Sequence, residues 1–236
     1  SCGDCFFCRR GLPQKCEHLF KYGHNAIAPG REFSGGFAEC CILTAGTGIV
    51  KLPDHLSDSL AAPANCAVST VAAAMRLAGP LGGNTVTILG CGVLGMNAVA
   101  MARFLGAEKV IACDLSPDRS ALASRFGATH FASPDELLEM TRDLTEGRGA
   151  DVALEFSGAA SAVSGALSAT RTGGTAVIAG TTTPGSEVKL DANDLVRRML
   201  TIRGLHNYGP QDLVSAVDFL TATAATIPFG ELAGVE

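Results

Sequence analysis

Hydrophobic positions along the chain change their spacing repeatedly, and these changes mark out its elements. From Asn84 onward, short apolar runs typical of buried strands alternate with segments whose apolar residues recur at helical spacing. Because strands and helices take turns, the pattern predicts an α/β fold with a doubly wound parallel sheet that helices cover on both faces. We expect strands over 85–89, 109–113, 129–131, 151–156, 175–179 and 200–204, and helices over 93–105, 117–126, 134–144, 159–169 and 191–199.

The chain before Asn84 follows a different pattern. Residues 1–60 are rich in turn-forming residues and contain two strand-like stretches, at 36–43 and 48–52. The alanine-rich sequence over 59–77 predicts a helix, with Pro63 near its start and Gly79 after its end. We therefore expect a small turn-rich region ahead of the main sheet.

Four of the nine cysteines lie close together at the start of the chain. Cys2, Cys5, Cys8 and Cys16 form the spacing C-x2-C-x2-C-x7-C, and four thiolates this close can surround one tetrahedral ion. An iron–sulfur cluster is the alternative. In the bacterial ferredoxin run, however, the fourth cysteine follows after three residues and precedes a proline, whereas Glu17 follows here. The spacing favours a structural zinc site that four protein ligands close.

The remaining cysteines have other expected roles. Cys40 and Cys41 are adjacent in the strand-like stretch at 36–43, so their side chains would face opposite sides of a strand and would not readily share an ion. We expect both to be buried as small hydrophobic residues, and Cys113 to lie in the core. The odd number of cysteines, with no secretory pattern at the start, argues against a disulfide framework and predicts a cytoplasmic protein.

A glycine-rich motif follows the first strand of the α/β region. Gly90, Gly92 and Gly95 form G-x-G-x-x-G, with Val93 and Leu94 inside it, between a strand and a helix. The first glycine permits a tight turn, the second lets the backbone approach a pyrophosphate, and the third lets helix and strand pack closely. The motif predicts a dinucleotide site of the Rossmann type at a helix N-terminus, where free N–H groups attract the anion.

An acidic residue ends the second strand of this region. Asp114 lies 19 residues after Gly95, where a carboxylate can accept hydrogen bonds from both hydroxyl groups of an adenosine ribose. The same charge would repel a 2′-phosphate, so Asp114 predicts NAD rather than NADP. Two roles stay open for the nearby Arg119, which either softens this preference or covers the adenine.

Composition narrows the choice of partners. The chain has 18 Lys and Arg residues against 23 Asp and Glu residues, so we expect neither nucleic acid nor a membrane surface as a partner. Hydrophobic residues make up 47% and charged residues 17%, which excludes disorder, and no apolar run is long enough to span a membrane. A small molecule is the expected partner.

In combination, these motifs resemble the zinc-dependent medium-chain alcohol dehydrogenases. The resemblance follows the chain through the four-cysteine cluster, Ser34-Gly-Gly-Phe-Ala-Glu39, Ala64-Asn-Cys66 with Thr70 after it, and the Gly90 loop. The stretches 9–16, 21–24 and 203–208 also resemble a bacterial subgroup associated with phosphonate catabolism. The family resemblance implies a Rossmann sheet plus part of a GroES-like β catalytic domain that carries the structural zinc lobe. It places the partial catalytic domain at 1–66, the dinucleotide-binding domain at 67–207 and the start of a return segment at 208–236.

The resemblance also assigns roles to single residues. Cys66 matches a protein ligand of the family's catalytic zinc, and Thr70 matches a residue beside the nicotinamide. Ser157 and Gly180 follow two further strands, where loops of the family line the coenzyme groove. His206 is a weaker candidate for contact with substrate or coenzyme. The family's other catalytic zinc ligands have no counterpart in this sequence, so we expect a chain that is truncated at both ends.

The implied activity is hydride transfer between an alcohol, or its aldehyde or ketone, and NAD, with zinc as the metal and a homo-oligomer as the assembly. Two alternatives stay open. One is a truncated, catalytically inactive NAD-binding fragment. The other is a zinc-free reductase of the same superfamily, against which the four-cysteine lobe and Cys66 both argue.

Overall fold

The computed structural model describes residues 1–180 and 184–232. The chain divides into two compact units, Ser1–Lys51 and Leu52–Glu236.

The first unit is built from turns. Its helical segments are α1 (Phe6–Arg9) and a 3-10 turn over Pro13–Lys15, and no residue of Ser1–Lys51 forms a strand. Tyr22 joins two turns that are distant in sequence, because its hydroxyl oxygen lies 3.0 Å from Oγ1 of Thr44 and 2.8 Å from Oγ1 of Thr47. Side-chain hydrogen bonds thus connect segments of this unit that are distant in sequence, as backbone hydrogen bonds do in a sheet.

The strands expected at 36–43 and 48–52 are therefore absent from this unit. A strand needs a neighbour for its N–H and C=O groups, and none of these segments has one. Phe37 and Ile49 are exposed despite their apolar side chains. Cys40 and Cys41 are exposed as well, so the expectation that they are buried in a strand was wrong.

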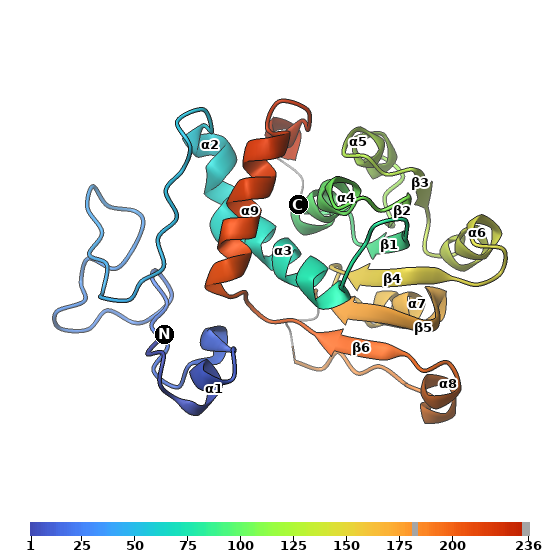
Figure 1. Cartoon of the computed structure of the whole chain (residues 1–236), viewed down its shortest axis with the longest axis horizontal. Coiled ribbons are helices and arrows are strands. Elements are labelled where there is room, and N and C mark those ends of the chain that lie inside the picture. Colours follow the sequence, from blue (N-terminus) through green and yellow to red (C-terminus); the bar gives the residue numbers. More distant parts are fainter. Residues whose placement is uncertain (181–183, 233–236) are drawn as a thin grey trace. The chain divides into compact units, whose positions relative to one another are not determined.

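The second unit contains the predicted parallel α/β sheet. Its six strands pair in the order β3-β2-β1-β4-β5-β6, and every pairing is parallel (Figure 1). All six strands lie where the hydrophobic pattern places them, although β5 begins earlier than expected. The strands are β1 (Thr85–Leu89), β2 (Lys109–Cys113), β3 (His130–Ala132), β4 (Ala150–Glu155), β5 (Thr170–Ile178) and β6 (Thr201–Gly204).

Helices cover both faces of this sheet, as the βα pattern predicts (Figure 1). Helices α3 (Ala67–Ala78), α4 (Val93–Phe104), α5 (Arg119–Arg125) and α9 (Pro210–Thr223) pack together on one face. Helices α6 (Leu137–Leu144) and α7 (Ala160–Ala169) pack on the other, over a core that includes Leu89 and Ile111. The remaining helical segments are α2 (Asp58–Ala61), α8 (Ala192–Arg197) and the 3-10 turns Ala62–Asn65 and Phe229–Leu232.

The chain order within the sheet reverses between β1 and β4. Strands β2 and β3 extend the sheet on one side of β1, whereas β4, β5 and β6 extend it on the other. The two neighbours β1 and β4 are in register, with Leu89 opposite Glu155 at their carboxyl ends. In open parallel sheets a crevice forms outside the strand ends at such a reversal, and this crevice is where ligands bind.

The helix expected over 59–77 is interrupted. It forms as α2, a 3-10 turn and α3, with Cys66 between the last two at φ −137° and ψ −76°. Pro63 lacks the N–H group that would continue α2, which accounts for the change from α2 to the 3-10 turn. Among the described residues no single helix has the length and apolar composition to cross a membrane; the bent pair Asp58–Asn65 and Ala67–Ala78 meets that test only when its two parts are counted together.

Candidate functional site

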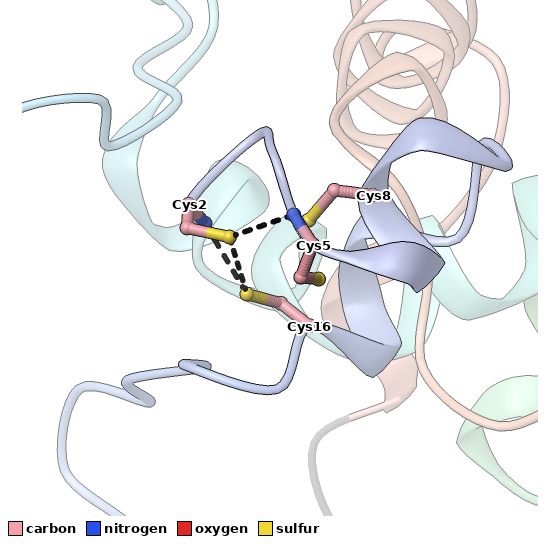
Figure 2. Close-up of side chains that lie close together, drawn as sticks. All are labelled: Cys2, Cys5, Cys8 and Cys16. Atoms are coloured by element: carbon pink, nitrogen blue, oxygen red, sulfur yellow. Dashed lines mark hydrogen bonds between the residues drawn. The ribbon is translucent and has the colours of Figure 1, made fainter.

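Four cysteines of the first unit converge as their spacing predicts. The ligand atoms of Cys2, Cys5, Cys8 and Cys16 all lie within 4.8 Å of one another (Figure 2). Helix α1 carries Cys8, with Cys5 at its N-cap, while the turn over Pro13–Lys15 delivers Cys16. One short helix and one turn therefore bring the four thiols together.

Backbone N–H groups point at the sulfur atoms of this cluster. Cys16 Sγ accepts from the N–H groups of Cys2 at 3.2 Å and His18 at 3.3 Å, and Cys2 Sγ accepts from Cys5 at 3.3 Å. N–H groups of Cys8 and Glu17 lower the pKa of Cys5 to about 6, whereas desolvation raises the pKa of Cys8 to about 11. When one thiol of such a cluster is ionised, its negative charge disfavours ionisation of its neighbours, unless a bound cation stabilises all the thiolates.

A tetrahedral metal ion fits the cluster. Zinc–sulfur bonds of about 2.3 Å place the four sulfur atoms about 3.8 Å apart, which the observed separations allow. Cys16 Sγ and Cys2 Sγ are 3.5 Å apart. Within the described part of the chain the group holds four thiols and no oxygen or nitrogen ligand, so an all-thiolate structural site matches these donors better than a catalytic site with an open position.

The glycine loop of the second unit has the close packing that its motif requires. Gly90 has φ +90°, and a Cβ atom there would lie 2.7 Å from the backbone nitrogen of Ser157. A Cβ atom on Gly95 would overlap the carbonyl oxygen of Gly90. Gly95 therefore lets the N-terminus of α4 approach the end of β1, and Gly90 lets the same loop approach the turn after β4.

Gly92 is in a different situation from its two neighbours. It caps α4 with extended backbone, φ −75° and ψ −164°, and a Cβ atom there would meet only Arg119 Nη1, at 3.8 Å. Val93 and Leu94 follow in the first turn of the helix and are half-buried. Open space next to the N–H groups of a helix N-terminus is suited to a pyrophosphate, so the residues present fit a dinucleotide.

Asp114 is tied to the same loop. Its Oδ2 accepts a hydrogen bond from Cys91 N at 2.7 Å, and its Oδ1 accepts one from Ser116 N at 2.9 Å. Arg119 forms an ion pair with Oδ2 at 3.3 Å, and the Asp114 side chain is 11% exposed. Oδ2 thus accepts two hydrogen bonds and Oδ1 accepts one, and Arg119 lies against both Asp114 and Gly92.

The predicted residues Ser157 and Gly180 follow the ends of β4 and β5. A Cβ atom on Gly180 would overlap the backbone nitrogen of Gly158, the residue after Ser157. Glu155, a buried carboxylate that organises this turn, was not among the predicted site residues, because a single acidic residue in an apolar strand is easily taken as part of the core. Its position at the end of a strand, two residues before Ser157-Gly158, was the available signal.

Cys66 and Thr70 lie apart from the glycine motif in sequence, at the start of α3. Cys66 is exposed, and its carbonyl oxygen accepts from Thr70 N at 3.0 Å. The carbonyl groups just before Cys66 are held by hydroxyl groups: Ser69 donates to Ala64 at 2.5 Å, and Tyr208 donates to Asn65. Burial, with a contribution from Cys66, raises the pKa of Tyr208. His206 lies just after β6 and is exposed.

Comparison with known proteins shows which family this chain is similar to. The family model for zinc-binding dehydrogenases matches residues 93–222, which is more than half of the chain. L-threonine 3-dehydrogenase from Colwellia psychrerythraea is 33% identical over 87% of this chain and 58% of its own length. The chain thus spans little more than half the length of the curated relatives it matches.

Solved structures extend the comparison to the fold. An alcohol dehydrogenase from Thermotoga maritima superimposes with a TM-score of 0.91 at 28% identity, over 98% of this chain and 65% of that one. A protein from Sinorhizobium meliloti 1021, named a zinc-binding dehydrogenase and solved with bound NADP, gives a TM-score of 0.80 at 30% identity, over 96% and 64%.

Proposed function

The chain belongs to the zinc-binding dehydrogenase family, and from that premise we propose that it supplies the coenzyme groove of a zinc-dependent oxidoreductase. The reaction is hydride transfer between an alcohol, or its aldehyde or ketone, and NAD. The observation that carries this proposal is the hydrogen bond from Cys91 N to Asp114. It links the Asp114 carboxylate to the loop that ends at Gly92, the N-cap of α4. At the reversal of the sheet, the helix N-terminus can bind the anionic pyrophosphate of a dinucleotide, and the carboxylate can accept from its ribose hydroxyl groups.

The residues of this chain bind and orient the coenzyme. The N–H groups at the start of α4 face the pyrophosphate, Asp114 accepts from the adenosine ribose, and the turn at Ser157 and Gly180 forms the wall between β4 and β5. A bound NAD would supply the hydride acceptor, and a catalytic zinc held in part by Cys66 would supply a Lewis acid for the alcohol oxygen. Thr70, at the start of α3, is proposed to lie beside the nicotinamide.

Cys66 is proposed as one ligand of the catalytic zinc. Its exposure and the two hydroxyl groups that hold the preceding carbonyls support this role. Catalytic zinc sites take three protein ligands, and among the described residues only the four-cysteine cluster groups metal ligands. We therefore expect the 236-residue chain to bind coenzyme without oxidising alcohols.

The four-cysteine cluster is proposed to hold a separate structural zinc. Its sulfur separations and its N–H···S hydrogen bonds support a closed tetrathiolate site. Such a site couples metal binding to the folding of the segment that carries it.

Assembly and location are proposed on separate grounds. Strand β6 is an edge of the sheet, and Ile202 in it and Met199 just before it are both exposed, which supports a homo-oligomer that covers this edge. None of the nine cysteines, all of them within the described residues, is in a disulfide, which supports a cytoplasmic location.

The proposal is tested in two steps. Titration of the chain with NADH should give saturable binding, and NADH should bind more tightly than NADPH. A longer protein that contains this chain is then assayed with NAD and a panel of alcohols that includes L-threonine, because the relatives are L-threonine 3-dehydrogenases. Cys66→Ser in that protein should abolish oxidation and leave NADH binding intact. Robust alcohol oxidation by the 236-residue chain alone would contradict the assignment of Cys66.

A further inference from the structure

Glu155 is a buried carboxylate at the centre of the sheet reversal. It is the last residue of β4, opposite Leu89 of β1 and Ile178 of β5, and its exposed fraction is 0%. No ion pair among the described residues involves it. Burying a carboxylate without a cation is costly, so its presence at this position calls for a local explanation.

Among the described residues, all hydrogen bonds of this carboxylate are made by one oxygen. Oε1 accepts from Ser157 Oγ at 2.7 Å and from Gly158 N at 2.7 Å, while Oε2 is buried and has no partner in the described part of the chain. Ser157 Oγ in turn accepts from Ala159 N at 3.2 Å. Glu155 thereby holds the whole turn that leads from β4 into α7.

This turn is the surface against which two groove glycines pack. A Cβ atom on Gly90 would lie 2.7 Å from Ser157 N, and one on Gly180 would overlap Gly158 N. The turn therefore lies between the ends of β1 and β5 with almost no free space. A shift of Ser157 or Gly158 would move the wall of the coenzyme groove.

We propose that Glu155 is a positioning residue for the coenzyme groove, and that it acts by fixing Ser157 and Gly158 through Oε1. This inference rests on the proposed coenzyme-binding function. Because one acceptor oxygen makes both hydrogen bonds, an amide can replace the carboxylate, whereas a methyl group cannot. The role depends on the acceptor geometry and not on the negative charge.

The test compares NADH affinity in three variants of the chain. Glu155→Ala should raise the Kd for NADH by about tenfold or more, and Glu155→Gln should stay within about threefold of the unmodified chain. Asp212→Ala is the matched control, since Asp212 is also a buried carboxylate that accepts a backbone N–H, that of Gly209 at 2.8 Å. It should lower stability and leave the Kd unchanged at temperatures where the protein is folded.

A second readout does not depend on coenzyme binding. Amide hydrogen exchange of the ligand-free chain should show faster exchange at Gly158 in Glu155→Ala and unchanged exchange in Glu155→Gln. The inference is overturned if Glu155→Ala keeps both the Kd and the Gly158 exchange rate, or if Glu155→Gln is as impaired as Glu155→Ala. An unmodified chain that fails to bind NADH would instead contradict the proposed function, and the exchange rates would still decide whether Glu155 fixes the turn.

Discussion

The carboxylate of Asp114 and the backbone of Cys91 are joined by a hydrogen bond of 2.7 Å between Oδ2 and the Cys91 N–H group. The acidic residue at the end of β2 and the glycine loop at the end of β1 are thus one structural unit. Asp114 therefore holds the loop for which we propose pyrophosphate binding, in addition to its proposed contact with the ribose.

Because Asp114 has these two roles, two substitutions of it should have different effects on coenzyme binding. Asp114→Asn keeps an oxygen that can accept from Cys91 but removes the charge, so the preference for NADH over NADPH should shrink by about tenfold while the loop stays ordered. Asp114→Gly removes both, so affinity for each coenzyme should fall as well. Parallel fluorescence titrations measure the two Kd values. Equal NADH/NADPH ratios in Asp114→Asn and the unmodified chain would show that the charge does not select the coenzyme.

Gly92 and Gly95 should respond differently to the same change. Gly95→Ala forces a Cβ atom into the Gly90 carbonyl oxygen, and overpacking of this kind costs about 1–3 kcal/mol or more of unfolding free energy. Gly92→Ala meets no atom closer than 3.8 Å, so the fold should be retained and only coenzyme binding should weaken. Urea unfolding and NADH titration of both variants distinguish the two effects. Tight NADH binding by Gly92→Ala would place the pyrophosphate elsewhere.

The cysteine cluster should contain zinc. Elemental analysis of the purified chain should find about one zinc per chain, because four thiolates make a closed tetrahedral site. Cys16→Ser should reduce the zinc content and increase proteolysis within Ser1–Lys51, while Cys40→Ser, an exposed thiol of the same unit, serves as the control. Iron–sulfur absorbance in place of zinc would contradict the assignment.

The two buried thiols beside the coenzyme site should be unreactive. Burial, and then the charge of Asp114, raise the pKa of Cys91 and of Cys113 from 9.0 to about 12. At pH 8 iodoacetamide should therefore modify the exposed Cys40, Cys41 and Cys66 and spare these two until the chain is unfolded.

The raised pKa values of Cys91 and Cys113 also predict how stability changes with pH. The folded state keeps both thiols protonated, so their contribution to stability is complete below about pH 9 and is lost as the pH rises toward about 12. Urea unfolding at a series of alkaline pH values measures this loss. Cys91→Ala combined with Cys113→Ala should flatten the decline over that window, and an unchanged decline would assign it to other groups.

One ion pair should contribute measurably to the packing of α3 against α9. Asp212 is buried and accepts from Arg76 at 2.7 and 3.0 Å as well as from Gly209 N. Asp212→Ala should lower the unfolding free energy by about 2 kcal/mol, because it leaves the Gly209 N–H group unsatisfied, whereas the half-exposed Arg76 regains water. Urea unfolding provides the value. Arg76→Ala should cost less, and a larger loss for Arg76 would place the main contribution in its packing.

Local sequence determined the α/β part of this protein to a large degree. Strands β1, β2 and β4 are mostly apolar runs, and Gly90 and Gly95 have a conformational or packing reason that holds wherever a strand turns directly into a helix. The four cysteines of the lobe are close enough in sequence for local turns to bring them together. In these cases the physical cause lies within a few residues of the feature, so the pattern was sufficient.

Tertiary structure alone decided the features that depend on neighbours. The segments at 36–43 and 48–52 have strand-like sequences but no partner strand in their unit, so their backbone is irregular and Cys40 and Cys41 are exposed. The sequence alone gives no role to Glu155. Its role depends on the sheet order, which brings Gly90 and Gly180 to either side of its turn. The hydrogen bond from Cys91 to Asp114 likewise exists only because β1 and β2 are adjacent and parallel. A hydrogen-bond partner or a close contact between residues far apart in sequence is set by the packing of elements, which the order of hydrophobic and polar positions does not specify.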